Sequence, residues 1–564
     1  IQQQFFEASI PERQHWNQSL MLKPSGVLDA NILRTVLQAL VLQHDALRLS
    51  FEDRDGTWNA RHLSPQAAQQ ADLLWQVQVA DAQALEAMAN QAQRSLDLQT
   101  GPLLRALLAT LEDGSQRLLL VIHHLAVDGV SWRILLEDLQ QAYQQLHNGQ
   151  PLQLPAKTHA FKEWSAALQG YAQGPALQAE LAYWQDCLQG ADADLPCERP
   201  DAGQHNRLAL TVESRLDQDL TRQLLQQAPA AYRTQVNDLL LTALARVIGR
   251  WTGQSSTLIQ LEGHGREALF EHLDLTRTVG WFTSLFPVRL TPAEALGDSL
   301  KQIKEQLRAI PNKGIGYGAL RYLGDGPVQQ CLRAMPSPRI TFNYLGQFDG
   351  SFEGDEAGLF VPAEESAGQE QSPDAPLGNW LTLNGQVYGG QLSIGWTFSR
   401  ERFSRATVAR LADEYTAELS ALIEHCLQPD VAGLTPSDFP LAKLGQAQLD
   451  SLPLAANQIA DLYPLSPMQQ GMLFHSLYEQ ASGDYINQVR LDVEGLDPQR
   501  FQQAWQAAVD SQDILRTGFV WQGQLARPLQ VVHKQLEMPF SVLDWRQRTD
   551  VEQALDALAA TEQA

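Results

Sequence analysis

Two adjacent histidines lie in the segment RLLLVIHHLAVDGVSW, in which His123 and His124 are followed by Asp128 and Gly129. Imidazole ionises closest to neutral pH among the side chains, so a histidine that can reach a substrate is suited to proton transfer. A lone histidine is most often structural. A pair followed at fixed spacing by Asp and Gly is more specific, because the Asp can fix the loop and the Gly permits a tight turn. We therefore take this segment as a candidate proton-transfer site.

The elements around the pair are predicted from the spacing of apolar residues. Residues 118–122 form an unbroken apolar run, which indicates a buried strand, and residues 123–129 form a loop. Ser131 is expected to cap a helix. Its inward face comprises Trp132, Leu135, Leu136, Leu139 and Tyr143. The histidines thus lie between a strand end and a helix N-terminus, which favours developing negative charge.

Composition restricts the class of protein. The chain has 564 residues and a formal charge of -24, so several globular lobes are expected and a nucleic-acid partner is not. Its apolar runs are too short to span a membrane. Cys187, Cys197, Cys331 and Cys426 show no metal-binding spacing, which fits unpaired thiols in a reducing compartment. No metal-ligand set, phosphate loop or dinucleotide turn is found, so we expect no bound cofactor.

A long-period repeat indicates two copies of one domain. Residues 28–52 match residues 496–520 without gaps at an offset of 468, with nine identities in 25 positions. The second copy ends at Ala564, before the position near 592 where a counterpart of His124 is expected. Residues 431–461, with several Pro and weak periodicity, are predicted to be a linker. The N-terminus lacks an initiator Met, so we expect a piece of a longer chain.

Two other segments are judged by composition and context. Residues 350–378 are rich in acidic residues and contain no Lys or Arg, which predicts a solvated loop, with an electrostatic docking surface as the minority alternative. Asp450, Ser451 and Leu452 imitate the triplet around the modified serine of a carrier protein. Because Pro453 follows and no surrounding helical bundle is predicted, we dismiss this match.

Several motifs together resemble the condensation-domain superfamily of non-ribosomal peptide synthetases. Its HHxxxDG signature is intact at His123 to Gly129. Five further motifs resemble those of the epimerization branch of this superfamily. They are IQQQFFE at the N-terminus, LEGHGRE from Leu261, RTVGWFTSLFPVRL from Arg277, GIGYG from Gly314, and FNYLGQFD from Phe342. The likeness covers about residues 1–430. YPLSPMQQGMLFHSL from Tyr463 and DILRTGF from Asp513 are similar to the start of a condensation domain.

The resemblance implies a fold of the α/β class, with two chloramphenicol-acetyltransferase-like lobes forming a V-shaped pseudo-dimer and a partial third α/β lobe. The expected boundaries are 1–185 and 186–430 for the lobes of an epimerization domain, 431–461 for the linker, and 462–564 for the truncated condensation domain. The substrate would be an aminoacyl or peptidyl thioester on the 4′-phosphopantetheine arm of an upstream peptidyl carrier domain. Downstream condensation and adenylation modules and a bacterial cytoplasmic location are also implied.

The resemblance also assigns roles to residues. Inverting a centre beside a thioester requires removing the α-proton, stabilising an enolate-like species and returning a proton to the opposite face. His124 and Glu262 are predicted to carry these protons, and Tyr344 is a weaker candidate donor. A one-base mechanism, in which the planar intermediate reorients so that the same group can reach its other face, stays open. Without the resemblance, Glu262 would be interpreted as a salt-bridging carboxylate beside Arg266 and Glu267.

The remaining predicted site residues are supporting ones. Asp128 is expected to organise the loop by pairing with Arg48, while His123, Gly129 and Asn343 are expected to support the site. Trp281 and Phe282 are candidates for lining a substrate tunnel or for ordinary core positions. Two alternative functions remain: a peptide-bond-forming condensation domain and a catalytically silent module that recruits partners. The intact histidine motif argues against the second, and Glu262 with its neighbouring motifs argues against the first.

Overall fold

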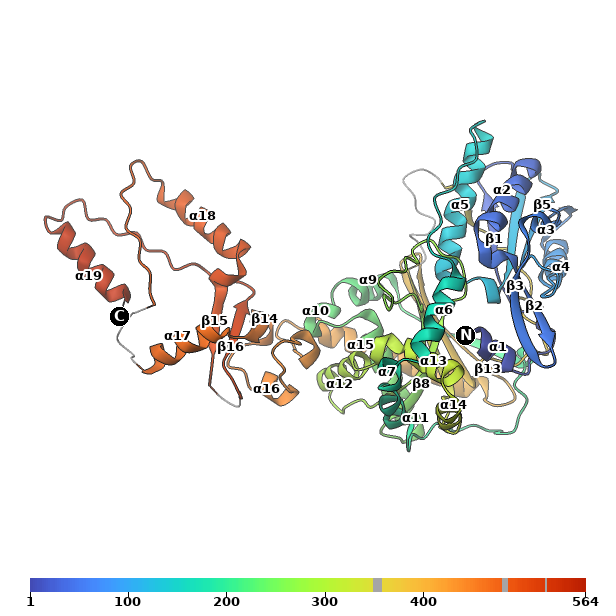
Figure 1. Ribbon diagram of the computed structural model, residues 1–564. Helices are drawn as coiled ribbons and strands as arrows, with labels where there is room; N and C mark the ends of the chain where they lie inside the picture. The colour runs from blue at the N-terminus through green and yellow to red at the C-terminus, as the bar shows by residue number, and fades with distance from the viewer. Residues whose placement is uncertain (348–357, 479–484, 523–524, 564) are drawn as a thin grey trace. The chain divides into compact units, whose positions relative to one another are not determined.

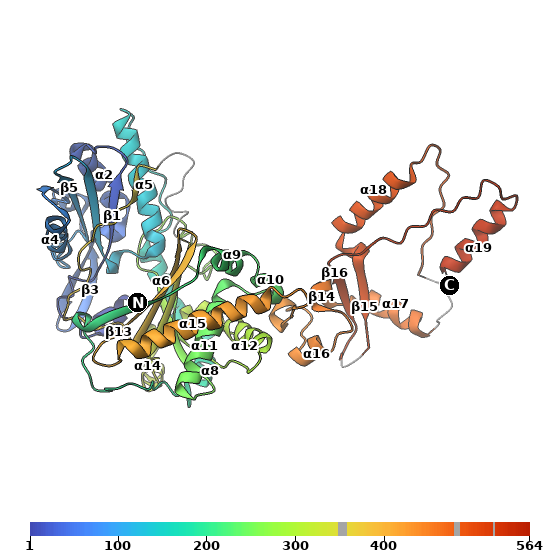
Figure 2. The same cartoon turned by 180° about the vertical axis from the view of Figure 1, so that it is seen from behind.

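The computed structural model describes residues 1–347, 358–478, 485–522 and 525–563 (Figures 1 and 2). The chain divides into two compact units. The first comprises Ile1–Leu225, Asn237–Ala293 and Ala309–Leu422, and the second comprises Gln226–Val236, Glu294–Arg308 and Ile423–Ala564. All residues of the candidate site lie in the first unit. None of the helices in the described residues is long and apolar enough to cross a membrane.

The first sheet of unit 1 has the strand order β11-β1-β6-β5-β4. Its strands are β1 (Asn17–Pro24), β4 (Leu74–Val79), β5 (Leu104–Leu111), β6 (Gln116–His123) and β11 (Phe360–Pro362). The apolar run in β6 confirms the predicted strand, because alternate side chains enter cores on both faces of the sheet. Leu118, Leu120 and Ile122 join one core, and Leu119 and Val121 join the other. A strand buried on both faces reads as a continuous apolar run.

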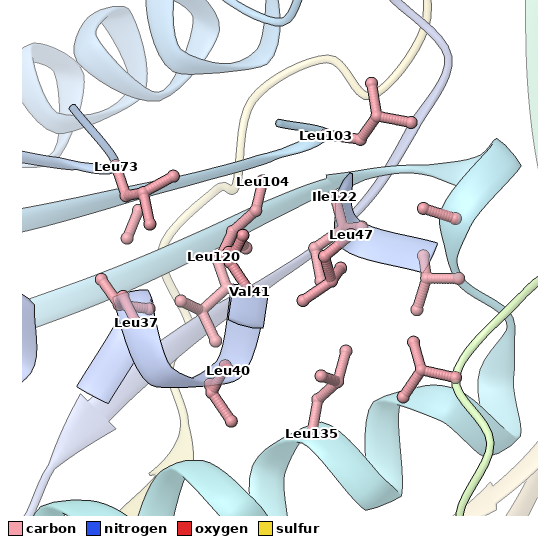
Figure 3. Close-up of a cluster of buried hydrophobic side chains, with 14 of the residues drawn as sticks. Leu37, Leu40, Val41, Leu47, Leu73, Leu103, Leu104, Leu120, Ile122 and Leu135 are labelled. Atoms are coloured by element: carbon pink, nitrogen blue, oxygen red, sulfur yellow. The ribbon is translucent and has the colours of Figure 1, made fainter. Parts of the chain in front are cut away.

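Two helices cover one face of this sheet, α2 (Ala30–Gln43) and α5 (Gly129–His147). The prediction of a helix after Asp29 is confirmed, since the Asp29 carboxylate accepts from the backbone N–H groups of Asn31 and Ile32. Side chains of α2 interlock with those of the strands and with Leu135 of α5 in the core shown in Figure 3. This packing fixes the start of α5 beside the end of β6.

The second sheet of unit 1 has the order β7-β13-β12-β10-β8-β9. Its strands are β7 (Ala209–Arg215), β8 (Thr257–Gly263), β9 (Ser284–Leu290), β10 (Ile340–Gln347), β12 (Leu381–Tyr388) and β13 (Gln391–Ser399). Helices α11 (Val236–Thr252) and α15 (Arg405–Cys426) cover one face, where Trp396 packs edge-on against Tyr415. In β12 the side chains alternate between buried and partly or fully exposed positions, so the opposite face is the more polar one.

Further elements of unit 1 connect and flank the sheets. These are α1 (Gln2–Glu7), β2 (Leu49–Arg54), β3 (Thr57–His62), α3 (Pro65–Gln69), α4 (Ala82–Gln93), α6 (Phe161–Ala172), α7 (Pro175–Gln178), α8 (Leu181–Leu188), α9 (Gln218–Gln226), α13 (Ile315–Leu323) and α14 (Gly326–Arg333). Trp164 of α6 packs with Phe282 and Ile315. Helix α6 therefore contacts the chain around the second sheet, although it precedes that sheet in sequence.

The acidic segment differs from the predicted solvated loop. Residues 350–357 lie outside the described residues, but from residue 358 onward the chain adds edge strand β11 to the first sheet, where it pairs with β1. Glu365 forms an ion pair with Arg117 at 2.6 Å, and Glu370 accepts a hydrogen bond from the Ser19 hydroxyl at 2.7 Å. Most of residues 358–378 do form loops, but the prediction of a solvated segment is wrong for β11, Glu365 and Glu370, because their partners lie hundreds of positions away in the sequence.

The second unit contains a three-stranded sheet of order β14-β16-β15. Its elements are α10 (Pro229–Tyr232), α12 (Leu296–Arg308), α16 (Gln446–Asp450), β14 (Ile459–Pro464), α17 (Pro467–Tyr478), α18 (Pro498–Ser511), β15 (Thr517–Val520), β16 (Leu529–His533) and α19 (Val551–Gln563). Parts of residues 431–461 fold onto this sheet, since Phe439 and Leu449 share a core with Val531. Ser451 directly follows the short helix α16.

The predicted repeat is visible in the local geometry. Helices α2 and α18 each have 14 residues, their bounds differ by the same offset of 468, and each is capped by an aspartate. Asp45 pairs with Arg48 in the first copy, as Asp513 pairs with Arg516 in the second. Burial differs: Leu33 is fully buried, whereas its counterpart Phe501 is 39% exposed.

Candidate active site

The histidine loop begins where β6 ends. His123 is the last residue of β6, residues His124–Ala126 form one 3-10 turn, and α5 starts at Gly129. The strand and the helix are both anchored in the core of the first sheet, so the short connection between them has little freedom. The predicted arrangement of strand, loop and helix is confirmed.

Both ring nitrogens of His123 are engaged within the protein. Its Nε2 lies 2.7 Å from the carbonyl oxygen of Arg13, and its Nδ1 accepts from the Leu125 N–H at 3.1 Å. A carbonyl only accepts, so Nε2 carries the hydrogen. Burial lowers the pKa of His123 to about 3, and its side chain is completely buried. These contacts fit the supporting role predicted for His123.

His124 has the opposite tautomer. Its Nδ1 lies 2.8 Å from the carbonyl oxygen of Val127, so Nδ1 carries the hydrogen and donates it. The lone pair of the neutral ring is therefore on Nε2, which lies 3.3 Å from Nε2 of Gln18. Burial lowers the pKa of His124, although the bond to Val127 acts in the other direction. His124 is thus a neutral imidazole with a basic Nε2.

The ring of His124 stacks on the indole of Trp281, with 4.2 Å between the ring centroids and 28° between the planes. Trp281 lies three residues before strand β9, in the chain around the second sheet. Of the two aromatic residues proposed as tunnel lining, Trp281 therefore contacts a predicted catalytic residue directly. Phe282 is buried under the guanidinium of Arg266, 4.0 Å from its centroid.

Asp128 organises the loop as expected, but through other partners. Its carboxylate accepts from the backbone N–H of Ser131 at 2.8 Å, so Asp128 and not Ser131 caps α5. It also pairs with Arg266 at 2.9 Å and accepts from the Phe282 N–H at 3.1 Å. These two contacts beyond the helix cap come from the segment before β9. Asp128 thereby ties the histidine loop to the second sheet.

The predicted pairing of Asp128 with Arg48 is wrong. Arg48 instead pairs with Asp45 at 2.5 Å and donates to the carbonyl oxygens of Val41 and Leu42. These bonds satisfy the C-terminal carbonyls of α2, which have no partner within the helix. The predicted tight turn at Gly129 is also absent. Gly129 is the first residue of α5, its φ is not positive, and a Cβ there would meet no atom within 4 Å.

Glu262 lies near the C-terminal end of β8, next to Asn343 of β10. Parallel pairing places Phe342 beside Leu261, so Glu262 and Asn343 follow in the same register. The Asn343 Nδ2 donates to Glu262 Oε2 at 3.0 Å. Strand alternation puts both side chains on the face of the sheet opposite to α11 and α15. The structure thus brings Glu262 and Asn343 together, as a carboxyl and its hydrogen-bond donor.

Burial raises the pKa of Glu262 to about 7, because the carboxylate loses its surrounding water and no cation among the described residues compensates for that loss. The salt-bridge interpretation does not apply to this residue. Arg266 pairs with Asp128, and Glu267 pairs with Lys313 at 2.9 Å. A carboxyl with a pKa near neutrality can both donate and accept a proton at physiological pH.

Tyr344 follows Asn343 in β10 and lies on the other face of the sheet. It is paired with Gly385, whose Cβ position would be 3.4 Å from the tyrosine ring. Burial raises the pKa of Tyr344. The structure therefore does not bring the Tyr344 side chain to the face that carries Glu262, and its role as a donor stays a prediction.

The turn after Glu262 depends on Gly265. Its φ is +66°, and a Cβ at this position would lie 1.7 Å from the carbonyl oxygen of Phe282. Only glycine accommodates both the backbone conformation and the close approach. Gly265 directs Arg266 toward Asp128, so the two glycines in EGHGRE gave a signal for a tight turn that spacing arguments did not use.

The site has two halves, the His124 loop and the segment around Glu262 on β8. They are joined by one residue from each half, Asp128 and Arg266. Arg266 follows Glu262 by four residues and Asp128 follows His124 by four, and these two charged residues form the buried ion pair. Sequence reasoning missed Arg266 in this role, and it missed Gln18 and the Trp132 indole N–H beside His124. Among the described residues, no cluster of three or more His, Cys, Asp or Glu side chains could hold a metal ion.

Comparison with known proteins places the chain. The Condensation domain family matches residues 1–444 and again residues 459–564. One of the subunits of linear gramicidin synthase from Brevibacillus parabrevis is 45% identical over 559 residues, which are 98% of this chain and 11% of that protein. Surfactin synthase subunit 1 from Bacillus subtilis (strain 168) is 42% identical over 458 residues, 80% of this chain and 13% of that protein. The chain thus spans about a tenth of the length of these curated relatives.

Solved structures show the same architecture. The epimerization domain from the third module of tyrocidine synthetase B is 37% identical, with a TM-score of 0.70, covering 76% of this chain and 96% of that domain. The X-domain from teicoplanin biosynthesis shares the fold at 19% identity and a TM-score of 0.59, covering 74% of this chain and 95% of that domain. These structures confirm the predicted fold of chloramphenicol-acetyltransferase-like α/β lobes. The chain therefore belongs to the condensation-domain family.

Proposed function

We propose that residues 1–430 epimerize the α-carbon of an aminoacyl or peptidyl residue that a carrier domain presents as a phosphopantetheine thioester. The observation that carries this proposal is Glu262, an uncompensated carboxyl with a pKa of about 7, placed in the same unit as the neutral His124. Peptide-bond formation between an amine and a thioester does not require a second proton carrier of this kind. Inversion by two bases does, because one group removes the α-proton and the other returns a proton to the opposite face.

The reaction proceeds in two balanced proton transfers. One group takes the α-proton, the C–H electron pair remains on the substrate, and a planar enolate-like thioester results. The other group then returns a proton to the opposite face. His124 Nε2 and the Glu262 carboxyl exchange these roles in the L-to-D and D-to-L directions, so the reaction equilibrates the two configurations. Their origin on different lobes suits an approach to the intermediate from its two faces.

The Asp128–Arg266 pair supports this mechanism by holding the His124 loop to the segment that follows Glu262 and β8. Positioning reactive groups in advance contributes to rate because it removes the entropy cost of bringing them together. Similarity to the epimerization domain of tyrocidine synthetase B, at 37% identity, supports the same assignment. The more distant structures support only the fold.

The proposed reaction implies particular neighbouring domains and a cellular location. The phosphopantetheine arm of an upstream peptidyl carrier domain delivers the substrate, and the chain itself needs no bound cofactor for these proton transfers. Residues 462–564 would begin a downstream condensation domain, after a linker at about 431–461, and an adenylation module would follow. We propose a bacterial cytoplasmic location, which fits the four free cysteines and the bacterial synthetases among the relatives.

The test is stereochemical. L-alanyl, L-leucyl and L-phenylalanyl thioesters on a separately purified carrier domain are incubated with the full chain in heavy water. We expect a mixture of L and D residues with deuterium at the α-carbon, measured by chiral chromatography and mass spectrometry. Peptide formation on addition of an aminoacyl acceptor, without inversion, would instead indicate condensation. Untouched chirality and isotope content with every substrate would indicate a recruiting module.

A further inference from the structure

Gln18 connects two parts of the first lobe that meet at the histidine loop. It lies on β1, which pairs antiparallel with β6, and its register partner is Ile122, two residues before His124. Gln18 Oε1 accepts from the Trp132 indole N–H at 3.0 Å, and Gln18 Nε2 lies 3.3 Å from His124 Nε2. One amide therefore links helix α5 to the ring of a proposed proton carrier.

The orientation of this amide is determined by chemistry. The indole nitrogen of Trp132 can only donate, so the amide oxygen of Gln18 must face it. The NH₂ group then faces His124. The ring of His124 is oriented by the same reasoning, because the carbonyl oxygen of Val127 can only accept and so receives Nδ1–H. What remains between Gln18 and His124 is an N–H donor directed at an unprotonated nitrogen.

This arrangement opposes protonation of His124 at Nε2. A protonated ring would direct an N–H at the amide NH₂, which has no lone pair to offer. If the Gln18 amide flipped by 180°, its oxygen could accept a hydrogen bond from the ring. The Trp132 N–H would then face an NH₂ group. A buried donor without a partner costs free energy, so the Trp132 bond resists that rotation.

We propose that Gln18, held by Trp132, is a positioning residue that keeps His124 in the Nδ1–H tautomer with a free lone pair on Nε2. The inference rests on the proposed function, in which this lone pair forms the new N–H bond as the substrate's α-C–H bond breaks. The donor–acceptor distance of 3.3 Å is long for a hydrogen bond, so an arriving substrate can displace the amide easily. Gln18 therefore maintains the base in its active form until substrate binds.

The main experiment observes His124 directly by NMR and needs no substrate. The full chain is labelled with ¹³C,¹⁵N-histidine and studied as a sediment by magic-angle-spinning NMR across a pH series. Signals of His124 are assigned among the 13 histidines by their loss in His124→Ala. For the unsubstituted chain we expect a neutral Nδ1–H ring that persists below the ordinary pKa of histidine.

Three variants change the group that faces Nε2. Gln18→Glu places a carboxylate between Trp132 and His124, which can accept from both, so the titration midpoint of His124 should rise by about one to three pH units. Trp132→Phe frees the Gln18 amide to flip, and Gln18→Met removes the NH₂ group that faces His124. Both should raise the midpoint less than Gln18→Glu does. The low-pH limb of α-deuterium exchange should move upward in the same order.

Matched controls separate this effect from loss of packing or added charge. Gln116→Glu adds the same charge at the far end of β6, where Gln116 accepts from the Leu28 N–H at 2.7 Å. Trp396→Phe removes one buried indole hydrogen bond, to Ser214 at 3.0 Å. Neither should move the titration of His124.

The inference is overturned if Gln18→Glu folds and leaves both the tautomer and the midpoint of His124 unchanged. If that variant does not fold, the same outcome for Trp132→Phe and Gln18→Met overturns it. A failure of the proposed function is a separate result: the unsubstituted chain would show the predicted histidine titration but would neither invert nor deuterate any thioester.

Discussion

The two halves of the site respond to burial in opposite ways. In the histidine loop, removal from water lowers the pKa of His124, whereas on the second sheet it raises the pKa of Glu262 to about 7. In both groups burial favours the neutral form, because the charged form loses its hydration. For the histidine the neutral form is a base, and for the glutamate it is an acid. Burial, a single physical cause, thus favours a neutral base on one lobe and a neutral acid on the other.

The halves also differ in how their groups are held. His124 is positioned by the nearby Val127 carbonyl and by two residues distant in the sequence, Gln18 and the stacked Trp281. Glu262 accepts a hydrogen bond from Asn343 and is directed mainly by its place on β8. We therefore expect substitutions near His124 to change both its tautomer and its pKa. Substitutions near Glu262 should change mainly the pKa of its carboxyl group.

The largest effects are expected from removing either proposed proton carrier. His124→Ala and Glu262→Gln should each slow inversion by about 10²- to 10⁴-fold, the range typical of a lost general acid or base. The measurement is the rate of L-to-D conversion on a loaded carrier domain. Glu267→Gln is the matched control, because Glu267 lies in the segment that follows β8 but pairs with the exposed Lys313. Full activity of Glu262→Gln would remove this carboxyl from the mechanism.

The next largest effect concerns the connection between the halves. Asp128→Asn or Arg266→Gln leaves one buried charge without its partner, which should cost about 3 kcal/mol of folding free energy and slow inversion by at least about tenfold. The double variant should lose less than the sum of the two single variants, since no charge remains uncompensated. Chemical denaturation and inversion rates measure both quantities. Additive losses would show that these two side chains do not act as a pair.

A smaller effect is expected in the pH dependence of stability. The pKa of Glu262 is raised on folding, so its contribution to stability is complete below the unfolded pKa, near 4.5, and is lost as pH rises to about 7. Glu262→Gln cannot ionise and should escape this loss. Relative to the unsubstituted chain, it should gain about 2 kcal/mol between pH 5 and pH 8, measured by denaturation at both values. An equal stability difference at the two pH values would contradict the raised pKa.

The smallest expected effect is on the hydrogen bond from Asn343. This amide donates to the Glu262 carboxylate and stabilises its charged form, so Asn343→Leu should raise the pKa of Glu262 further. The pH at which inversion is half-maximal should move upward, and the maximal rate should fall by only about threefold to tenfold. Asn384→Leu is the matched control, because Asn384 pairs with Asn343 on the neighbouring strand. A downward movement of the profile would show that the amide does not stabilise the charged carboxylate.

Much of the fold could be predicted from sequence because it is encoded locally. The apolar run of β6 and the spacing of apolar residues after Asp29 are properties of short segments, and both elements form where expected. The repeat was equally visible. It even contained the signal that would have prevented the error at Arg48, since Asp45 and Arg48 recur as Asp513 and Arg516 and pair locally in both copies.

The remaining features depend on contacts between distant residues. Arg266 reaches Asp128 across 138 positions, and Glu365 reaches Arg117 across 248. No spacing rule predicts such partners in a single sequence. Gln18 was missed for the same reason, since only the pairing of β1 with β6 brings it beside His124. The motifs thus indicated which residues are proposed to carry the chemistry, but not which residues hold them in place.

In the proposed mechanism, His124 and Glu262 each serve one face of the α-carbon. The most direct test follows α-deuterium incorporation from pure L- and pure D-aminoacyl carrier thioesters, with His124→Ala and Glu262→Gln, in heavy water. We expect opposite defects: each variant loses exchange from one configuration and retains measurable exchange from the other. Equal loss from both configurations in one variant, with no effect of the other substitution, would contradict a two-base mechanism and support a single base.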